Sequence, residues 1–314
     1  MKIAITGISS YLASEIIPLL DNDDTITEIL GLDIVQKDYN SSKVKFKTRD
    51  VRDPQLENDL KGFDAILHLA FIVSPMKNKN EMYSINIDGS RNVFNCAINA
   101  GVKKIVHASS VAAYGSFPDN PIPITEDLPI RKMKKSFYYH DTKYAVEKII
   151  DDLQDKYPNV IFTRIRPHIF LGKGIDNIFK NYFKGETIYM LNADGLSQFI
   201  YVTDVAKMFY LALLKDAPGA FNCGGDNPIP TRDIGKSLNK KVKNIPHRLA
   251  LFFLVPLQKL RIIKIDLAGW VRISRYPIIV DSSKAKKILG WKPDFDTLGT
   301  VKQLFKDLEE RGEV

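Results

Sequence analysis

Three side chains in the middle of the chain, Ser110, Tyr139 and Lys143, have the types and spacing of an acid–base centre. Tyr139 and Lys143 are four residues apart, so on a helix their side chains project from the same face. A tyrosine with an ordinary pKa near ~10 is a weak base at neutral pH, but a neighbouring ammonium can lower that pKa by roughly 1–3 units. Such a set could move a proton off an alcohol while a nicotinamide cofactor takes the hydride. Tyr144 and Lys148 repeat the spacing, so the surrounding elements must decide which pair reacts.

The N-terminal residues have the pattern of a nucleotide-binding strand, loop and helix. An apolar strand over residues 2–6 leads into the loop Gly7-Ile8-Ser9-Ser10-Tyr11-Leu12-Ala13, and an amphipathic stretch follows. Glycine permits unusual backbone angles at the turn, and the small residues Ser10 and Ala13 let the backbone approach a pyrophosphate. The start of the helix adds free N–H groups and positive potential. Ser10 and Ala13 replace two of the glycines expected in this loop.

A second strand, over residues 27–32, ends at Asp33. This carboxylate lies 20 residues after Ala13, the distance expected for an acid that binds the ribose of a dinucleotide. An acid at this position accepts hydrogen bonds from both ribose hydroxyls and repels a 2′-phosphate. The sequence therefore favours NAD over NADP, and the nearby Lys37 weakens that preference.

Strands and helices alternate through the first half of the chain. Short apolar or β-branched runs over residues 44–48, 65–70 and 104–109 predict strands, and stretches over 53–61 and 81–100 predict helices. This alternation is typical of a doubly wound α/β fold, in which ligands bind at the carboxyl ends of parallel strands. Asp50, Ala70 and Ser110 all follow such strands.

A series of short motifs, in order along almost the whole chain, resembles the extended short-chain dehydrogenases/reductases of the NAD-dependent epimerase/dehydratase family. The series comprises Asp50-Val51-Arg52-Asp53, His68-Leu69-Ala70-Phe71, Asn86 to Asn92, Ser109 to Gly115, Tyr139 to Glu147, Arg166 to Gly172, Phe199 to Ala206, and Ser282 to Pro293. The resemblance implies a Rossmann-type sheet with a smaller C-terminal substrate-binding lobe, and it favours Tyr139 over Tyr144.

The resemblance also implies roles for individual residues. Tyr139 would be the general base on a substrate hydroxyl, Lys143 would hold the nicotinamide ribose and lower the pKa of Tyr139, and Ser110 would orient the hydroxyl. Substrate contacts would come from Ser110, His168 and Arg275. Asn86 has a second interpretation, because asparagine is a good helix N-cap without any cofactor. The residues expected to contact NAD are Gly7, Ser9, Ser10, Tyr11, Leu12, Asp33, Asp50, Val51, Leu69, Ala70, Phe71, Asn86, Ala108, Tyr139, Lys143, Pro167 and Ile169.

Two departures from the family pattern bear on the reaction. Val111 and Ala112 stand where sugar dehydratases of the family carry an Asp-Glu pair, which argues against dehydration. Epimerisation through a transient ketone, or net oxidation or reduction of a secondary alcohol, remains. Ser197 stands where related nucleotide-sugar epimerases carry an arginine that binds the substrate's pyrophosphate, while Arg272, Arg275 and the basic tract 131–135 keep an anionic substrate open.

The main prediction is thus an NAD-dependent nucleotide-sugar epimerase, with two alternatives. One is a dehydrogenase or reductase of a bulky hydrophobic alcohol or ketone, and the other is a non-catalytic NAD-binding sensor, against which the intact set of Ser110, Tyr139 and Lys143 argues.

An apolar run over residues 249–257 is followed by Lys259, Arg261 and Lys264. Its length and Pro256 argue against a membrane span, which needs roughly 20 apolar residues. Three interpretations remain: a helix in the core of the small lobe, a hydrophobic lid over a lipid-like substrate, or an interfacial anchor. The first is favoured, because short apolar helices usually lie in a core.

Composition excludes several other classes of function. The net charge of +8 comes from basic residues scattered among acids, and the tracts at 131–135 and 284–287 lack interleaved aromatics, so a solvated face is favoured over nucleic-acid binding. The two cysteines, Cys96 and Cys223, are predicted to be buried thiols, and neither they nor the five histidines have the spacing of a metal site.

The chain begins directly with its first strand, which predicts a cytoplasmic protein. Residues 1–166, with 199–225 returning to the sheet, should bind NAD, and 167–198 and 226–314 should bind the substrate. The family resemblance implies a homodimer through the helices near 85–100 and 140–157.

Overall fold

A seven-stranded parallel sheet forms the centre of the computed structural model, which describes residues 1–74, 76–134, 137–175, 185–192, 194–260 and 266–313. Its strand order is β11-β6-β5-β4-β1-β2-β3. The order reverses between β1 and β4, which is where doubly wound sheets bind ligands. The strands are β1 (Lys2–Thr6), β2 (Glu28–Asp33), β3 (Val44–Thr48), β4 (Ala65–His68), β5 (Lys104–Ala108), β6 (Ile161–Pro167) and β11 (Gly219–Cys223).

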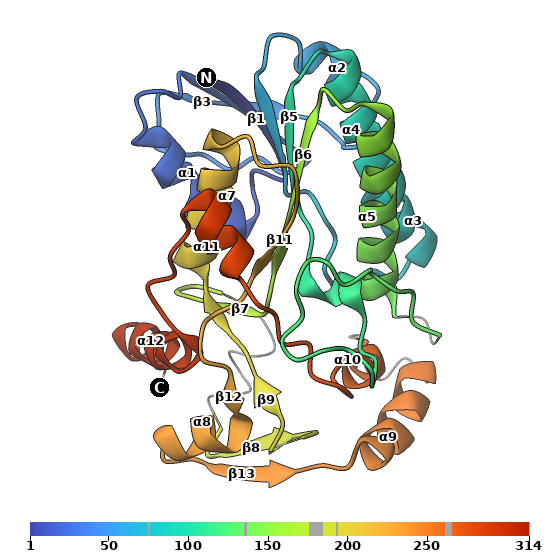
Figure 1. Ribbon diagram of the computed structural model, residues 1–314, viewed down its shortest axis with the longest axis vertical. Helices are drawn as coiled ribbons and strands as arrows, with labels where there is room; N and C mark the ends of the chain where they lie inside the picture. The colour runs from blue at the N-terminus through green and yellow to red at the C-terminus, as the bar shows by residue number, and fades with distance from the viewer. Residues whose placement is uncertain (75, 135–136, 176–184, 193, 261–265, 314) are drawn as a thin grey trace.

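Helices cover both faces of this sheet, as Figure 1 shows. One face carries α1 (Tyr11–Asp21), α7 (Val202–Leu214) and α11 (Ser283–Leu289). The other carries α2 (Leu56–Asp59), α4 (Gly89–Asn99) and α5 (Tyr138–Lys156). Because both faces are covered, the inner strands are apolar throughout, and every residue of β4 is buried. The predicted Rossmann-type α/β fold is confirmed.

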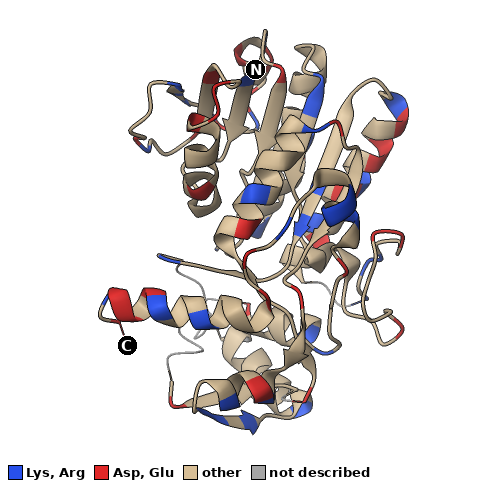
Figure 2. Ribbon diagram, turned by 60° about the vertical axis from the view of Figure 1, so that its left-hand side comes forward, with Lys and Arg blue, Asp and Glu red and all other residues tan. Residues whose placement is uncertain are grey.

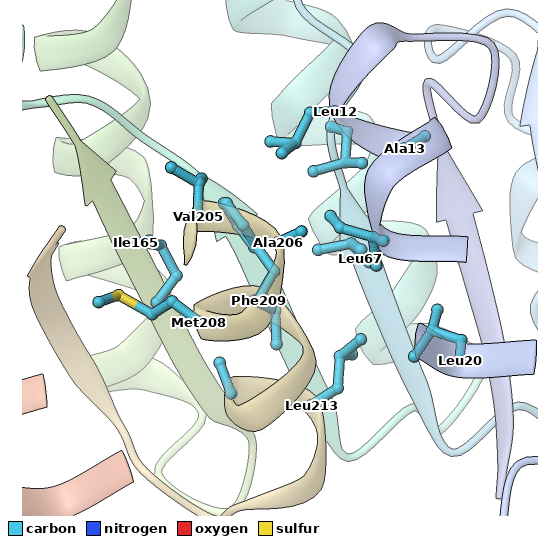
Figure 3. Close-up of a cluster of buried hydrophobic side chains, with 14 of the residues drawn as sticks. Leu12, Ala13, Leu20, Leu67, Ile165, Val205, Ala206, Met208, Phe209 and Leu213 are labelled. Carbon is cyan, nitrogen blue, oxygen red and sulfur yellow. The ribbon is translucent and has the colours of Figure 1, made fainter. Parts of the chain in front are cut away.

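Apolar packing between α1 and α7 fixes the helix that follows the N-terminal loop. In Figure 3, Leu12 and Leu20 of α1 lie near Ala206 and Phe209 of α7 and near Leu67 of β4. Leu20, Leu67 and Phe209 are fully buried. Burying one such side chain stabilises the fold by about 1.5–3 kcal/mol, so the position of the α1 N-terminus is set by this core.

Two of the predicted helices differ in detail. The expected helix over 53–61 is only α2, four residues long, because turns occupy the flanking positions. The expected helix over 81–100 is a continuous helical stretch of α3 (Lys79–Tyr83), a π-helical turn (Ser84–Asp88) and α4. π-Helical turns are found frequently at functional sites.

The C-terminal part of the chain forms the lower end of the molecule in Figure 1, from short strand pairs and helices around a separate apolar cluster. The pairs are β7 (Phe170–Leu171) with β10 (Ile200–Tyr201), β8 (Thr187–Met190) with β13 (Lys241–Asn244), and β9 (Leu196–Ser197) with β12 (Ile229–Pro230). The helices are α8 (Thr231–Ser237), α9 (His247–Lys259), α10 (Leu267–Ile273) and α12 (Thr297–Glu310). Within residues 199–225 only β11 joins the main sheet, because β10 pairs with β7.

The apolar run at 249–257 is helical, as part of α9, but it does not enter a core. None of the α9 side chains that the structure describes is buried, and Phe252 is 72% exposed. The core-helix interpretation is therefore wrong. Across the described ranges, every helix is too short or too polar to cross a membrane. Arg261, Lys264 and Lys135 lie outside the described residues.

Candidate active site

The structure brings Ser110, Tyr139 and Lys143 together at the carboxyl end of β5. Ser110 follows that strand, and Tyr139 and Lys143 lie in the first turns of α5. The Ser110 hydroxyl lies close enough to the phenol of Tyr139 to lower its pKa, and it accepts a hydrogen bond from the Ala112 N–H at 3.2 Å. Ser110 therefore caps the 3₁₀ turn Val111–Tyr114 in addition to contacting the tyrosine.

The neighbouring Tyr144–Lys148 pair is arranged differently. Lys148 is exposed, and its Nζ pairs with Asp151 at 2.8 Å. The side chain of Lys143 is buried, and its Nζ donates to the carbonyl oxygen of Ala108 at 2.7 Å. Geometry thus distinguishes two pairs that have identical spacing in the sequence.

Aromatic rings surround the Tyr139 side chain, which remains partly exposed. Its ring centroid lies 6.1 Å from that of Phe71, 6.3 Å from that of Phe137 and 5.7 Å from that of Trp270. Burial raises the pKa of Tyr139, and the nearby Ser110 hydroxyl lowers it, with burial the larger effect. This differs from the sequence prediction of a lowered pKa, because the Lys143 ammonium lies 5.8 Å from the tyrosine ring centroid and bonds elsewhere.

The side chain of Lys143 is buried, and its pKa is close to neutral pH. Burial lowers its pKa to about 7, against the attraction of Glu147, which raises it. Its Nζ lies 3.3 Å from the centroid of the Phe71 ring, a cation–π contact that favours the charged form. This side chain can therefore gain or lose its proton near neutral pH.

Beside Ser110, Tyr139 and Lys143 lies a buried ion pair between Glu147 and Arg166. Two guanidinium nitrogens of Arg166 donate to Glu147 at 2.8 Å, and the Ser109 hydroxyl donates to the same carboxylate at 2.6 Å. Burial alone would raise the pKa of Glu147, but Arg166, with help from Arg164, lowers it to about 2. These contacts join α5 to β6 and to the residue that precedes Ser110, so they fix the helix that carries Tyr139.

His140 connects two loop segments that precede Tyr139 in the chain. Its Nε2 accepts a hydrogen bond from the Met133 N–H at 3.0 Å, so Nδ1 carries the proton and donates to the Ala112 carbonyl at 2.8 Å. Burial lowers the pKa of His140, consistent with the neutral ring. This role was not predicted, although a histidine directly follows the tyrosine in the sequence.

The loop after β1 has the geometry of a dinucleotide cradle. Gly7 has a φ of 76°, and a Cβ built on it would lie 2.5 Å from the backbone nitrogen of Ala70. Only glycine therefore fits where the loop crosses the end of β4. The helix α1 begins directly after Ser10, whose side chain accepts from the Ala13 N–H at 3.3 Å. The first N–H groups of a helix such as α1 favour an anion, and a pyrophosphate is one.

Asp33 ends β2 beside this loop, as the sequence predicted. One carboxylate oxygen accepts from the Ser9 N–H at 3.1 Å and the other from the Val35 N–H at 3.2 Å. These bonds fix the carboxylate at the position of a ribose-binding acid and leave lone pairs for hydroxyl donors. The chain thus fits an adenosine ribose here.

The other expected adenine-side residues have partners of their own. Asp50 forms a two-point ion pair with Arg52, at 2.9 and 2.6 Å. Val51 is buried against Gly89, where a Cβ would lie 2.5 Å from a Val51 methyl. Leu12 belongs to the core with α7, and the Tyr11 hydroxyl donates to the carbonyl of Lys173 at 2.9 Å.

Asn86 fixes the segment that follows β4. Its side-chain oxygen accepts from the Ile72 N–H at 2.7 Å, and its amide donates to the Ile72 carbonyl at 3.0 Å. The interpretation of Asn86 as a helix N-cap is wrong, since the residue lies inside the π-helical turn. It holds in place the segment Leu69, Ala70 and Phe71, which the sequence assigned to the cofactor.

On the nicotinamide side, β6 ends at Pro167. Both ring nitrogens of the adjacent His168 are engaged: Nδ1 accepts from the Ile169 N–H at 2.8 Å, and Nε2 donates to the Ile278 carbonyl at 2.8 Å. His168 therefore ties the sheet to the segment after α10. Arg275 is exposed at the end of α10.

The substrate side contributes one residue that the sequence analysis missed. Trp270, in α10, places its indole against Tyr139 and also against Phe137, with a centroid distance of 5.1 Å. The tract between the apolar run and Arg272 contains no motif that marks this tryptophan. At the position of the missing pyrophosphate-binding arginine, Ser197 is hydrogen-bonded to Thr231 at 2.5 Å.

Comparison with known proteins identifies the family. A family model described as "NAD dependent epimerase/dehydratase family" matches residues 3–224. The chain belongs to this family. It is an NAD-dependent enzyme of the oxidoreductase/epimerase type, and NAD is its cofactor.

Two curated relatives differ in activity. The sterol-4-alpha-carboxylate 3-dehydrogenase, decarboxylating, of Mus musculus is 28% identical, over 93% of this chain and 86% of that protein. The UDP-glucose 4-epimerase of Lactobacillus helveticus is 24% identical, over 96% of this chain and 94% of that protein. Among solved structures, the UDP-glucose 4-epimerase of Thermotoga maritima has a TM-score of 0.76 at 20% identity and full coverage of both chains, which shows the shared fold.

The residues present fit NAD at the strand ends. Gly7, Ser10 and the α1 N-terminus would hold its pyrophosphate, and Asp33 its adenosine ribose. When bound, NAD accepts or returns a hydride at the nicotinamide C4. A substrate hydroxyl that reaches Tyr139 could give its proton to the deprotonated phenolate form of this side chain, with the Ser110 hydroxyl close by.

Proposed function

We propose that Tyr139 is the general acid–base, that Ser110 orients the reacting hydroxyl, and that Lys143 supplies the positive charge that stabilises the tyrosinate. The nearness of the Ser110 hydroxyl to the Tyr139 phenol, whose pKa it lowers, supports this assignment. The pKa of Lys143, near 7, lets it serve as a proton donor or an ammonium at physiological pH. His168 and Arg275 remain proposed substrate-side residues.

We propose that the enzyme is a nucleotide-sugar epimerase, and helix α10 carries this proposal. The helix places Trp270 against the catalytic Tyr139, where an aromatic ring suits the apolar face of a sugar. Arg272 and Arg275 occur on the last turn of the same helix and directly after it. Guanidinium groups bind phosphate oxygens in a two-point geometry, so one short element offers groups for both parts of such a substrate.

The absence of a dehydratase pair supports epimerisation. Val111 and Ala112 are buried in the 3₁₀ turn after Ser110 and have no acid or base to expel water from the sugar. The relatives that act on nucleotide sugars include a UDP-glucose 4-epimerase that aligns with 96% of this chain.

The test is incubation of the purified enzyme with UDP-glucose, with the 4-epimer detected by NMR. Epimerisation without added NAD is the expected result, because the cofactor would be regenerated on the enzyme in each cycle. Arg275→Gln should raise KM for the nucleotide sugar and leave NAD affinity unchanged. No epimer from any UDP- or dTDP-linked hexose would exclude the proposal.

A second candidate is a dehydrogenase or reductase of a bulky hydrophobic alcohol or ketone. It is favoured by the Ser197–Thr231 contact at the expected phosphate clamp and by the apolar cluster next to Tyr139, which contains Ile72, Met76, Met133, Trp270 and Ile278. The mouse sterol dehydrogenase relative is consistent with it. Formation of NADH at 340 nm with a bulky secondary alcohol would support this candidate over the first.

We also propose a cytoplasmic homodimer that pairs the outer faces of α4 and α5. Beside α5 is a groove of about 540 Å³, lined in part by Tyr83, Ile87, Met133 and Tyr144, which a second copy could fill. The substrate lobe would comprise residues 167–198 and 226–314. Light scattering on the purified protein measures the oligomeric state directly, and a monomer at all concentrations would exclude the dimer.

A further inference from the structure

Helix α9 presents an apolar stripe to solvent at the lower end of the molecule (Figure 1). The exposed side chains are Leu249 (48% exposed), Phe252 (72%), Phe253 (58%) and Leu260 (70%). Their spacing places them along one side of the helix. Phe252 and Phe253 also contact each other, with ring centroids 5.3 Å apart. An exposed apolar patch of this kind on a soluble domain marks a surface that another partner covers.

The opposite side of α9 is fixed to the protein. The Gln258 amide donates to the Asp266 carboxylate at 2.9 Å, and its oxygen accepts from the Ala268 N–H at 3.0 Å. Asp266 is the N-cap of α10 and Ala268 lies in its first turn. The apolar stripe is therefore held outward by contacts to the helix that carries Trp270.

The net charge of the chain is concentrated in one segment of the sequence, which includes β13 and α9. Residues 234–265 contain eight Lys and Arg residues and no Asp or Glu. The formal net charge of the whole chain is +8, so the remaining residues are balanced. Lys241 and Lys243 are exposed on β13, the strand that precedes α9 in the chain, and Arg248 is exposed in the first turn of α9. Figure 2 shows blue segments at the lower end of the molecule, where Figure 1 places β13.

We propose that this end of the molecule, formed by α9 and β13, docks on a lipid bilayer that carries anionic headgroups. The stripe of Leu249, Phe252, Phe253 and Leu260 enters the boundary between headgroups and acyl chains, and the exposed basic side chains of Lys241, Lys243 and Arg248 contact the phosphates. A helix with an apolar face and a basic surround lies in the plane of the interface in this way. Charge complementarity decides the occupant, because a second copy of this chain would bring eight more positive charges to the same face.

The docking proposal is independent of the reaction, because the rings around Tyr139 that the structure describes, those of Phe71, Phe137 and Trp270, come from neither α9 nor β13. Co-sedimentation of the full chain with vesicles tests it. Vesicles of phosphatidylcholine with phosphatidylglycerol should bind the protein, those of phosphatidylcholine alone should bind it at least about tenfold more weakly, and added salt should release it.

Two variants separate the apolar and the charged contributions. Phe252→Ser with Phe253→Ser should weaken binding to the anionic vesicles about tenfold or more, whereas Ile288→Ser, at a 45% exposed position on α11, should not. Lys241→Gln with Lys243→Gln should weaken binding and reduce its salt dependence, whereas Lys302→Gln with Lys306→Gln on α12 should have little effect. Retained NAD binding verifies that each variant is folded.

Three results would overturn the proposal. The first is no binding of the unmodified protein to either kind of vesicle, and the second is equal binding of the double-serine variant. The third is a dimer in solution that dissociates when Phe252 and Phe253 are replaced, since this would show that a second copy covers the stripe.

Discussion

The two ends of the molecule form their sites in different ways. At the cofactor end, backbone geometry forms the site. The backbone of Gly7 lies too close to that of Ala70 for any side chain, and the seven-stranded parallel sheet fixes the positions of the strand ends. At the substrate end, two-stranded pairs and short helices carry isolated side chains such as Trp270, and the outermost helix has no buried residue among those described. The cofactor end therefore fixes where hydride transfer occurs, while the substrate end can change specificity without disturbing it. Substitutions at the two ends should separate cofactor effects from substrate effects.

The largest effect is expected from Lys143→Met. Loss of the ammonium should lower turnover by about 1,000-fold, and the unfolding free energy should rise at pH 6. The folded-state pKa of Lys143 is about 7, below the ordinary value of 10.5, so its burial penalty is fully present below pH 7 and disappears as the pH rises toward 10.5. Thermal unfolding at pH 6 and pH 10 checks the sign: the gain in Tm should shrink at the higher pH.

Glu147→Gln should have the next largest effect. It acts through the buried ion pair that joins α5 to β6. Removing this charge leaves Arg166 buried without its counter-ion, which should destabilise the protein by about 3–5 kcal/mol. The folded-state pKa of Glu147 is lowered to about 2, so its contribution is present above its ordinary pKa of 4.5 and is lost as the pH falls toward 2. Urea unfolding at pH 7 and pH 3 should show a smaller difference at pH 3. Glu309→Gln, at an exposed position, should change neither value.

Gly7→Ala tests whether the cofactor end depends on backbone approach, and Gly62→Ala is its control. Both glycines have a positive φ, 76° and 81°, but a Cβ at Gly62 meets no atom within 4 Å. Gly62→Ala should lose about 1–2 kcal/mol from backbone strain, and Gly7→Ala should lose more, because its Cβ would also clash with the Ala70 backbone. Only Gly7→Ala should weaken NAD binding, by about 100-fold, because the loop must move away from β4. Equal NAD affinity in the two variants, measured by calorimetry, would show that the cradle tolerates this displacement.

Trp270→Ala should have the smallest effect, and it should appear only in substrate parameters. Loss of the indole beside Tyr139 should lower kcat/KM by about tenfold, and NAD affinity should not change. Trp291→Ala is the contrasting variant, because that tryptophan is 1% exposed in the core and should destabilise the fold instead. A fall in NAD affinity in Trp270→Ala would remove the separation between the two ends.

The cofactor end could be predicted from the sequence in most respects, because its features follow local rules. A glycine at a strand end, an acid 20 residues after the loop, and alternating strands and helices each have one physical interpretation. Ser110, Tyr139 and Lys143 meet as expected, since a strand end and one helical turn position all three.

The rest depended on tertiary contacts that no local pattern encodes. The pKa of Tyr139 is raised because aromatic rings from distant segments bury it, and Trp270 reaches it only through the fold of α10. Asparagine is a common helix N-cap, but the side-chain amide of Asn86 binds the backbone of Ile72. The run at 249–257 was apolar enough for a core, but the lobe leaves one face of α9 uncovered.

The most direct test of the central claim is the steady-state turnover of Tyr139→Phe, with NAD affinity measured on the same preparation and Tyr144→Phe as the control. The arrangement of Ser110, Tyr139 and Lys143 predicts a loss of about 1,000-fold in kcat with NAD affinity unchanged, and full activity in Tyr144→Phe. Full turnover in Tyr139→Phe would contradict the claim that this phenol is the acid–base of the reaction.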